Sequence, residues 1–232
     1  MNIAIDGPAG AGKSTIAKLA ASALGSVYVD TGAMYRTLAL FVLEKGIDPS
    51  DEKGVLDVIG GADITLSYVD GVQHISLNGR DVTGEIRTAE VTRTSSMIAA
   101  YAGVRSYLVA MQQKIAARMP VVMDGRDICS VVLPDAEVKI YLTASARKRA
   151  ERRLLQNEEM QKANGGPALT PEEREAELGR IEQEIRDRDY RDMHREASPL
   201  VQAPDAVVVD SSDMTIDEVV AAILEIAEKA AK

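Results

Sequence analysis

The amino-acid sequence predicts an α/β fold in which helices cover both faces of a parallel sheet. Three observations predict it. Short apolar runs rich in β-branched residues alternate along the chain with longer stretches of helical periodicity. Several of these runs end in aspartate just before the next helical stretch. A glycine-rich loop directly follows the first run. Because such sheets bind ligands at the carboxyl ends of their strands, we expect the functional residues to follow the strands.

The glycine-rich loop over 7–14 carries the strongest chemical signal. It reads G-x-x-x-x-G-K-S, the P-loop pattern, and lies between an apolar run at 3–5 and a helical run at 16–21. Its backbone N–H groups and the following helix N-terminus form a nest for phosphate oxygens. Lys13 is expected to reach the β- and γ-phosphates, and the Ser14 hydroxyl to bind Mg²⁺. We therefore predict that a nucleoside triphosphate is bound by Gly7, Pro8, Ala9, Gly10, Ala11, Gly12, Lys13, Ser14 and Thr15.

The composition narrows the class of protein. A chain of 232 residues with 46% hydrophobic residues suits one large α/β domain. No apolar run reaches the ~18 residues of a transmembrane helix, and the first strand begins at Asn2, so we expect a cytoplasmic protein without a signal peptide. The single cysteine excludes an internal disulfide. A net charge of −9 and 3% aromatic residues argue against a nucleic-acid surface.

The second predicted strand, over 26–30, leads into a helix that starts near Thr31. The end of this strand should lie at the same sheet edge as the P-loop, which brings Asp30, Thr31 and Arg36 toward the nucleotide. Two alternatives remain open from the residues alone. Thr31 can act as the N-cap of the helix, and Arg36 can be a solvated helix residue. A shorter helix is expected over 51–61.

The period of the sequence changes between residues 62 and 84. Strand-like runs at 63–69, 73–77 and 80–82 are separated by an Asp-Gly pair and an Asn-Gly pair, which are strong hairpin signals. Consecutive hairpins of this kind do not belong to a parallel sheet. We therefore predict a small antiparallel β insert over 62–84.

Two helices are predicted over 85–100 and 104–118, followed by an apolar strand at 120–124. The strand ends on Asp124 and continues with Gly-Arg-Asp at 125–127. An apolar strand that ends in aspartate is the Walker B pattern, which places the carboxylate near the metal of a P-loop protein. Taken alone the pattern is weak, because any buried strand can end in aspartate.

The last part of the chain contains the remaining strands and a long charged helix. The long helix opens at Thr170 with a capping pattern, and a second such pattern opens the final helix at Thr215. The other elements expected here are a strand at 137–142, an arginine-rich helix at 146–156, a loop at 164–167, a strand at 206–210 and a helix at 215–231.

The long helix carries Arg188, Asp192 and Arg195 with the spacing i, i+4 and i+7, so these side chains share one face. A surface ladder of ion pairs with Asp187 and Asp189 is the alternative interpretation. Guanidinium groups pair bidentately with phosphate, so the chain's arginines favour a phosphorylated acceptor beside the triphosphate. A nucleotide phosphate has a second pKa of about 6, so such an acceptor needs positioning and a metal rather than a base.

Six segments carry a resemblance to one family. They are IDGPAGAGK at 5–13, DTGAMYR at 30–36, GEIR at 84–87, DGRD at 124–127, RDYRD at 188–192 and ASPL at 197–200. With these segments the chain resembles bacterial cytidylate (CMP) kinases, of the nucleoside monophosphate kinase group of P-loop kinases. Thr31 stands where this family often has serine, a change that keeps the hydroxyl.

The resemblance implies the arrangement of the fold. It implies a P-loop NTPase-type three-layer α/β fold whose five-stranded parallel sheet has the order 2-3-1-4-5 and is flanked by helices, with the small antiparallel insert and a short lid. Residues 1–232 would form a single P-loop kinase domain. Its parts would be a core at 1–61, 85–150 and 196–232, a monophosphate-binding insert at 62–84, and a lid region at 151–195.

The resemblance also implies the reaction. ATP would phosphorylate CMP and dCMP to CDP and dCDP by direct in-line transfer, with Mg²⁺ as the cofactor, as a step of pyrimidine nucleotide metabolism. ATP and CMP or dCMP would be the only partners, without nucleic acid or membrane, and we expect a monomer.

The family's functional residues map onto matching positions of this chain. Catalytic roles would fall on Lys13, Arg126, Arg188 and Asp124. The metal would be held by Ser14 and by Asp124, the latter through water. Cytosine would be read by Ser96, Arg105 and Asp127, the pentose contacted by Arg188 and Asp192, and the complete CMP site would be Thr31, Arg36, Ser96, Arg105, Arg126, Asp127, Arg188 and Asp192.

Two other functions remain open from the sequence. The first is a P-loop kinase that phosphorylates a hydroxyl group, with Asp30 as the base. The second is a nucleotide-dependent binding or switch protein without catalysis, although no N-K-x-D guanine motif of a regulatory GTPase occurs. Turnover with a panel of nucleosides and nucleotides distinguishes the three.

Overall fold

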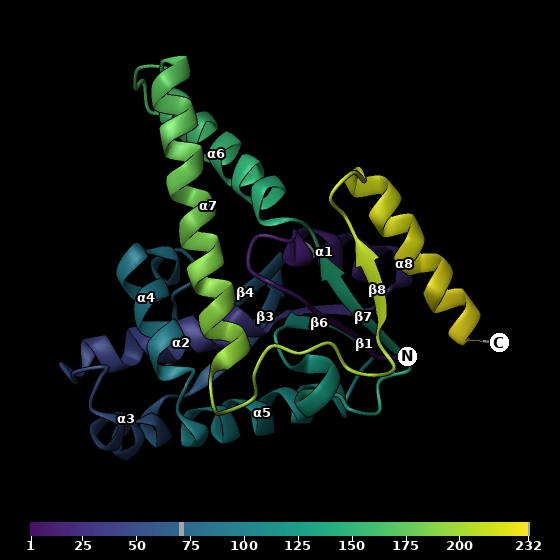
Figure 1. The fold of residues 1–232 in the computed structure, drawn as a ribbon. Coiled ribbons are helices and arrows are strands. Elements are labelled where there is room, and N and C mark those ends of the chain that lie inside the picture. The colour runs from purple at the N-terminus through teal and green to yellow at the C-terminus, as the bar shows by residue number, and fades with distance from the viewer. Residues whose placement is uncertain (70–71, 232) are drawn as a thin grey trace.

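A computed structural model describes residues 1–69 and 72–231 of the chain (Figure 1). Its centre is a five-stranded sheet in which all neighbouring strands pair in parallel, in the order β2-β6-β1-β7-β8. Counted within this sheet alone, that order reads 2-3-1-4-5 as expected; the labels differ because they also count the strands of the insert. The strands are β1 (Ile3–Asp6), β2 (Val27–Asp30), β6 (Val121–Gly125), β7 (Val138–Thr143) and β8 (Val207–Asp210).

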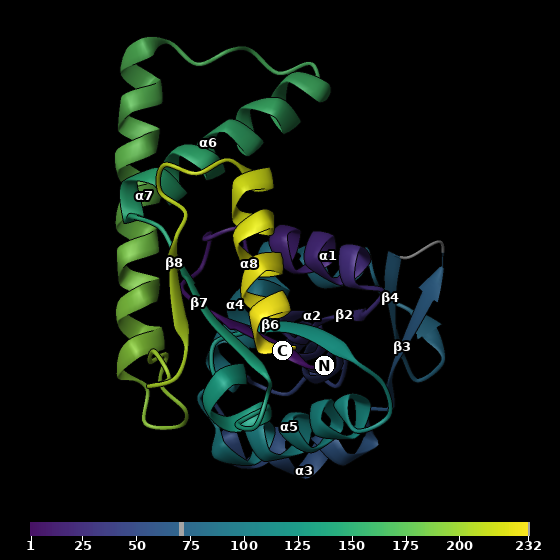
Figure 2. The ribbon, with the colours of Figure 1, turned by 90° about the vertical axis from the view of Figure 1, so that its right-hand side faces the viewer.

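Helices cover both faces of this sheet because its strands are apolar on both sides. In β1, Ile3 and Ile5 pack on one face with residues of α1 and α8, whereas Ala4 packs on the other face with residues of α2 and α5. Figure 2 shows α1 and α8 on one side of the sheet and α5 on the other. These helices are α1 (Lys13–Leu24), α2 (Thr31–Glu44), α5 (Ala102–Ala116) and α8 (Ile216–Ala230).

The predicted antiparallel insert is present as a separate sheet with the strand order β3-β4-β5. Asn78 and Gly79 both have positive φ, 50° and 80°, which is the backbone of the expected Asn-Gly hairpin turn. The predicted turn at 70–71 lies outside the described residues. The strands are β3 (Ile64–Val69), β4 (Val72–Leu77) and β5 (Arg80–Asp81), and α3 (Glu52–Val58) with a 3₁₀ turn (Ile59–Gly61) precedes them.

The helix predicted over 85–100 is wrong in its first turn. A 3₁₀ turn (Glu85–Arg87) comes first, and α4 (Ala89–Ile98) begins only after Thr88. The Thr88 hydroxyl accepts the N–H of Val91 at 3.2 Å, so this residue serves as an N-cap and interrupts the helical run.

The arginine-rich helix is longer than predicted. α6 (Ala146–Ala163) continues past residue 156 and packs obliquely, as Figure 2 shows, against α7 (Pro171–His194), which opens with the expected capping box at Thr170. We call this pair the α6–α7 hairpin; it projects from the sheet in Figure 1. Its contact surface is a small apolar cluster of Ala150, Leu154, Leu178 and Ile181. In the described part of the chain, no helix combines the length and the apolar composition needed to cross a bilayer.

Candidate active site at the carboxyl ends of the strands

The strand order brings three predicted segments to one sheet edge. Asp30 at the end of β2 is in register with Asp124 of β6, and Ile5 of β1 is in register with the same aspartate. The P-loop therefore leaves β1 beside the carboxyl ends of β6 and β7. Gly7 passes so close to β7 that a Cβ atom there would lie 1.9 Å from the Leu142 carbonyl oxygen. Only glycine fits at this position.

Lys13 lies inside the P-loop. Its ammonium group donates to the Pro8 carbonyl at 2.8 Å, and the side chain is buried. Burial, together with the nearby Arg126 guanidinium, lowers the Lys13 pKa to about 7. The arrangement holds the Lys13 amine at the mouth of the phosphate loop, where the negative charge of a polyphosphate would favour its protonated form.

Asp124 joins two elements of the site. Its Oδ2 accepts the Ser14 hydroxyl at 2.9 Å and its Oδ1 accepts the Tyr28 hydroxyl at 2.8 Å. Burial raises the Asp124 pKa to about 6. A hydroxyl beside a carboxylate is a fitting donor set for Mg²⁺, which binds few protein oxygens and completes its shell with phosphate and water. Within the described residues no cluster of three metal-ligating acidic, histidine or cysteine side chains occurs.

At the β2–α2 junction, the structure decides the two alternatives that the sequence left open for Thr31 and Arg36. Asp30, not Thr31, is the N-cap of α2, because its Oδ1 accepts the N–H of Ala33 at 2.8 Å. The buried Thr31 hydroxyl instead donates to the Asp124 carbonyl at 2.6 Å. Arg36 is not a solvated helix residue, since it pairs with Asp30 at 3.0 Å and its side chain is 22% exposed.

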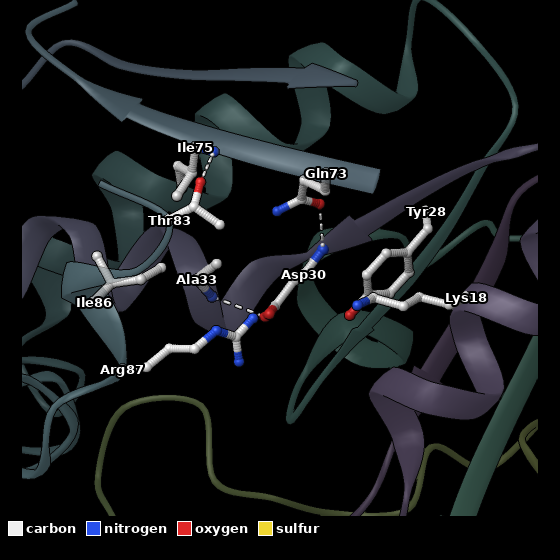
Figure 3. A pocket seen from close by; sticks show the side chains of 9 residues that line it. All are labelled: Lys18, Tyr28, Asp30, Ala33, Gln73, Ile75, Thr83, Ile86 and Arg87. Carbon is white, nitrogen blue, oxygen red and sulfur yellow. Dashed lines mark hydrogen bonds between the residues drawn. The ribbon is translucent and has the colours of Figure 1, made fainter. Parts of the chain in front are cut away.

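The insert contacts this same junction. The Gln73 side-chain oxygen accepts the Asp30 N–H at 2.9 Å, and the Tyr68 hydroxyl donates to the Tyr28 carbonyl at 2.8 Å. Figure 3 shows the small pocket between the insert and α2, with Gln73 above Asp30 and Arg87 beside it. The insert thereby supports the segment that carries Arg36.

Arg105 of α5 and Asp127 form a buried ion pair, and each side chain is 6% exposed. Arg105 also donates to the Ala99 carbonyl at 3.2 Å, whereas its buried Nε has no partner among the described residues. The Tyr35 ring lies 5.6 Å from this guanidinium, and burial raises the Tyr35 pKa to about 12. Ser96 stands apart: it is exposed, and its hydroxyl donates to the Thr92 carbonyl of its own helix.

The C-terminal part of α7 meets the segment that follows β6. Arg126 donates from Nε to Asp192 at 2.8 Å. Asp189 pairs with Arg149 instead of taking part in a ladder, so the predicted alternative of a surface ion-pair ladder is wrong. Burial and the Arg126 and Arg36 guanidinium groups lower the Arg188 pKa.

Several buried donors in this region lack partners. Within the described residues these are the Nε atoms of Arg36, Arg105 and Arg188, the Nη2 atom of Arg195 and the Tyr35 hydroxyl. Buried polar groups are almost always hydrogen-bonded, so a cluster of orphaned donors indicates a ligand rich in acceptors. The structure thus brings together the predicted Arg36, Arg126, Arg188 and Asp192 beside the P-loop, and Arg105 with Asp127 in an adjoining buried pair.

Sequence reasoning assigned no role to several residues that hold the site. The Asp6 carboxylate accepts the N–H groups of Ile128 and Cys129, each at 2.8 Å, and so fixes the backbone just after Asp127. Tyr28 holds Asp124, and Tyr35 lies near Arg105. The signal for Asp6 was its place at the end of the first strand, and Tyr35 lies in the DTGAMYR segment at 30–36. For Tyr28 the sequence offers no signal.

Comparisons with known proteins agree on one family. The family model described as cytidylate kinase matches residues 3–229. The cytidylate kinase of Lactobacillus johnsonii is 46% identical over 232 residues, covering 100% of this chain and 96% of the relative. That of Caldicellulosiruptor bescii is 46% identical over 100% of this chain and 97% of the relative. That of Leuconostoc mesenteroides is 48% identical over 97% of this chain and 96% of the relative.

Proposed function

We propose that this chain, which belongs to the cytidylate kinase family of nucleoside monophosphate kinases, transfers the γ-phosphoryl group of ATP directly to CMP and dCMP. The observation that carries this proposal is a group of arginines around the P-loop lysine: Arg126 acts on both Lys13 and Arg188, and among the described residues the buried Nε atoms of Arg36 and Arg188 have no partner. A triphosphate in the loop and a monophosphate among the arginines would supply the missing acceptors. The products are CDP and dCDP, which enter pyrimidine nucleotide metabolism.

On the donor side, the P-loop backbone binds the phosphates and Lys13 stabilises the charge of the transferring group. Ser14 and Asp124 would hold Mg²⁺, Asp124 through water. The bound ion neutralises charge on the β- and γ-phosphates. The Ser14–Asp124 hydrogen bond keeps these two groups together before the nucleotide arrives.

On the acceptor side, Arg36, Arg126 and Arg188 hold the CMP phosphate in line with the γ-phosphoryl group. The monophosphate is already deprotonated at neutral pH, because its second pKa is about 6. The enzyme therefore needs no general base, and its work is positioning and charge stabilisation. Asp192 keeps Arg126 in place and, together with Arg188, contacts the pentose.

Cytosine would be read by Arg105 and Asp127. The carboxylate accepts from the exocyclic N4 amino group, and the guanidinium donates to the N3 and O2 acceptors. Among the described residues the Arg105 Nε has no partner, which is consistent with this assignment. Thr31 and Ser96 complete the proposed CMP site from the β2–α2 junction and from α4.

The α6–α7 hairpin supports the proposed lid at 151–195. Its two helices share their own apolar cluster, so the outer part of the hairpin can move as a unit while the turn of α7 at 188–192 stays at the site. Closure would exclude water from the phosphates and protect ATP from hydrolysis. We assign 62–84 as the monophosphate-binding insert and the remaining segments, 1–61, 85–150 and 196–232, as the core.

A kinase that phosphorylates hydroxyl groups with Asp30 as base is disfavoured by one observation. Both carboxylate oxygens of Asp30 are engaged, one by the N–H of Ala33 and one by Arg36. A base held in two such contacts is poorly placed to accept a substrate proton.

The decisive experiment measures ATP consumption with CMP, dCMP, UMP, AMP and cytidine as acceptors. We expect turnover with CMP and dCMP and little with the others. Turnover with cytidine would support the hydroxyl kinase. ATP binding without turnover for any acceptor would support the binding or switch protein and overturn our proposal.

A further inference from the structure

Arg149 of α6 and Asp189 of α7 form a buried ion pair that the reaction described above does not use. We propose that this pair is a positioning element for phosphoryl transfer, because it ties the P-loop to the part of α7 that carries Arg188 and Asp192. The inference rests on the proposed function and adds to it a fixed spatial relation between the donor and the acceptor sites.

One guanidinium group contacts three parts of the chain. Its Nη1 donates to the Ala9 carbonyl of the P-loop at 2.9 Å and to Asp189 Oδ1 at 3.1 Å. Its Nη2 donates to Asp189 Oδ2 at 2.6 Å, which completes a bidentate pair with α7. Its Nε donates to the Ala144 carbonyl, between β7 and α6, at 2.8 Å. The planar fork of arginine is required to reach all these acceptors at once.

The pair is sealed from solvent. The Arg149 side chain is 5% exposed and that of Asp189 is 13% exposed. Arg149 also lies directly against the loop, since a Cβ atom on Gly10 would be 3.4 Å from the Arg149 Cβ. Side chains packed this closely transmit a shift of α7 to the P-loop backbone.

Asp189 lies on α7 between two residues of the proposed acceptor site, so its pair with Arg149 links that site to the P-loop. Asp189 follows Arg188 directly and precedes Asp192 by three residues, so all three belong to the same turn of helix. Asp192 pairs with Arg126 on the acceptor side. Through Asp189, this turn is also tied to Ala9 on the donor side. The same turn of α7 therefore touches both nucleotide sites.

Other ion pairs between α6 and α7 do not have this property. Arg174 of α7 pairs with Glu158 of α6 at 2.9 Å, with side chains 47% and 27% exposed. Arg147 of α6 pairs with Glu175 of α7 at 3.0 Å. These pairs join the same two helices without a contact to the P-loop, and they provide a matched control.

The expected consequence is a loss of kcat with little loss of binding. Each nucleotide site keeps its own residues when the pair is removed, so ATP alone and CMP alone should still bind. Their relative placement is lost, and a misplacement of about 1 Å between reacting groups can cost about 100-fold in rate. A pair that serves only stability would instead lower Tm and leave the kcat of the folded enzyme unchanged.

The test replaces both charges together, because removing one partner of a buried pair leaves an unpaired charge and endangers folding. In Arg149→Met/Asp189→Leu, we expect a folded protein whose kcat with CMP is about 100-fold lower. Calorimetric Kd values for ATP alone and CMP alone should stay within about threefold of wild type. The control Arg174→Gln/Glu158→Gln should keep kcat within about twofold.

A second variant, Arg149→Lys, tests the proposal if the double variant does not fold. Arg149→Lys keeps the charge but loses the planar fork, so it cannot hold Ala9, Ala144 and Asp189 together; we expect kcat to fall about tenfold. The inference is overturned if folded Arg149→Met/Asp189→Leu keeps kcat near wild type, or if the lost rate is matched by equal losses of binding. Absence of CMP turnover in the wild type would refute the proposed function itself, which separates the two failures.

Discussion

Replacing Asp127 by asparagine should weaken the preference for cytosine over uracil. The substitution is nearly isosteric, and Arg105 still needs an acceptor for the guanidinium nitrogen that now holds Asp127 Oδ2. The amide oxygen will take that position, since the amide nitrogen cannot accept. The NH₂ group then replaces Oδ1, the oxygen that would receive the cytosine amino group. It repels that donor and suits the O4 acceptor of uracil.

The magnitude follows from the bonds that change. A hydrogen bond to a charged group contributes about 1.5–3 kcal/mol, and a neutral one about 0.5–1.5 kcal/mol. CMP loses a hydrogen bond of the first kind and UMP gains one of the second kind, so the difference between the two substrates changes by about 2–4.5 kcal/mol. At about 1.4 kcal/mol per factor of ten, the CMP/UMP ratio of kcat/KM should fall roughly 30- to 2,000-fold.

The assay is steady-state kcat/KM for CMP and UMP, with Tm recorded for each protein. Asp205→Asn provides the matched control, because it makes the same chemical change at an exposed aspartate that pairs with Lys139. A folded Asp127→Asn enzyme whose CMP/UMP ratio stays within about threefold of wild type would show that the base is read elsewhere.

Three further predictions concern the phosphate groups. Lys13→Ala should lower kcat by at least about 10³-fold in a folded protein, measured by steady-state kinetics and circular dichroism, because the transferring phosphoryl loses its cation; near-normal turnover would contradict the site. Arg126→Lys should lower kcat more than it raises the KM for CMP, because lysine loses the fork that holds both phosphate and Asp192; an effect on KM alone would mark Arg126 as a ground-state binder. Since the Lys13 pKa is lowered to about 7, the free enzyme holds this amine mostly neutral at about pH 8. Binding of magnesium-free ATP should raise the Lys13 pKa again, so that the complex takes up close to one proton. Calorimetry in buffers of different ionisation enthalpy measures this uptake, and binding heats that do not depend on the buffer would refute the prediction.

The strands and the P-loop could be predicted because their signals are local. Apolar runs that end in aspartate, and glycines followed by Lys13, lie within a few residues of one another. The N-cap at the β2–α2 junction could not be decided in this way, because Asp30 and Thr31 are both good caps. The register of β2 with β6 decides which residue is the N-cap. This register places the Thr31 hydroxyl at the Asp124 carbonyl, so Asp30 caps the helix.

Other features depend on partners distant in the sequence. Arg149 stands in a helix with several arginines, and only the packing of α7 shows that it alone meets Asp189 and Ala9 among the described residues. A π-helical turn (Ile128–Val132) follows β6, and its five mostly apolar residues are too few to give a helical period. Its backbone donors find the Asp6 carboxylate, more than a hundred positions earlier.

The central place of β1 in the sheet has a consequence for synthesis on the ribosome. Ile3 pairs on one side with Val122 and on the other with Val138, so the first strand made has no sheet neighbour until more than half of the chain exists. Contacts of such long range form late and slow the folding of parallel sheets. The P-loop would leave the ribosome early, yet its backbone would acquire its shape only when β6 and β7 close around β1. Nascent chains that end before residue 120 should therefore bind no ATP, and nucleotide affinity should arise together with the completed sheet.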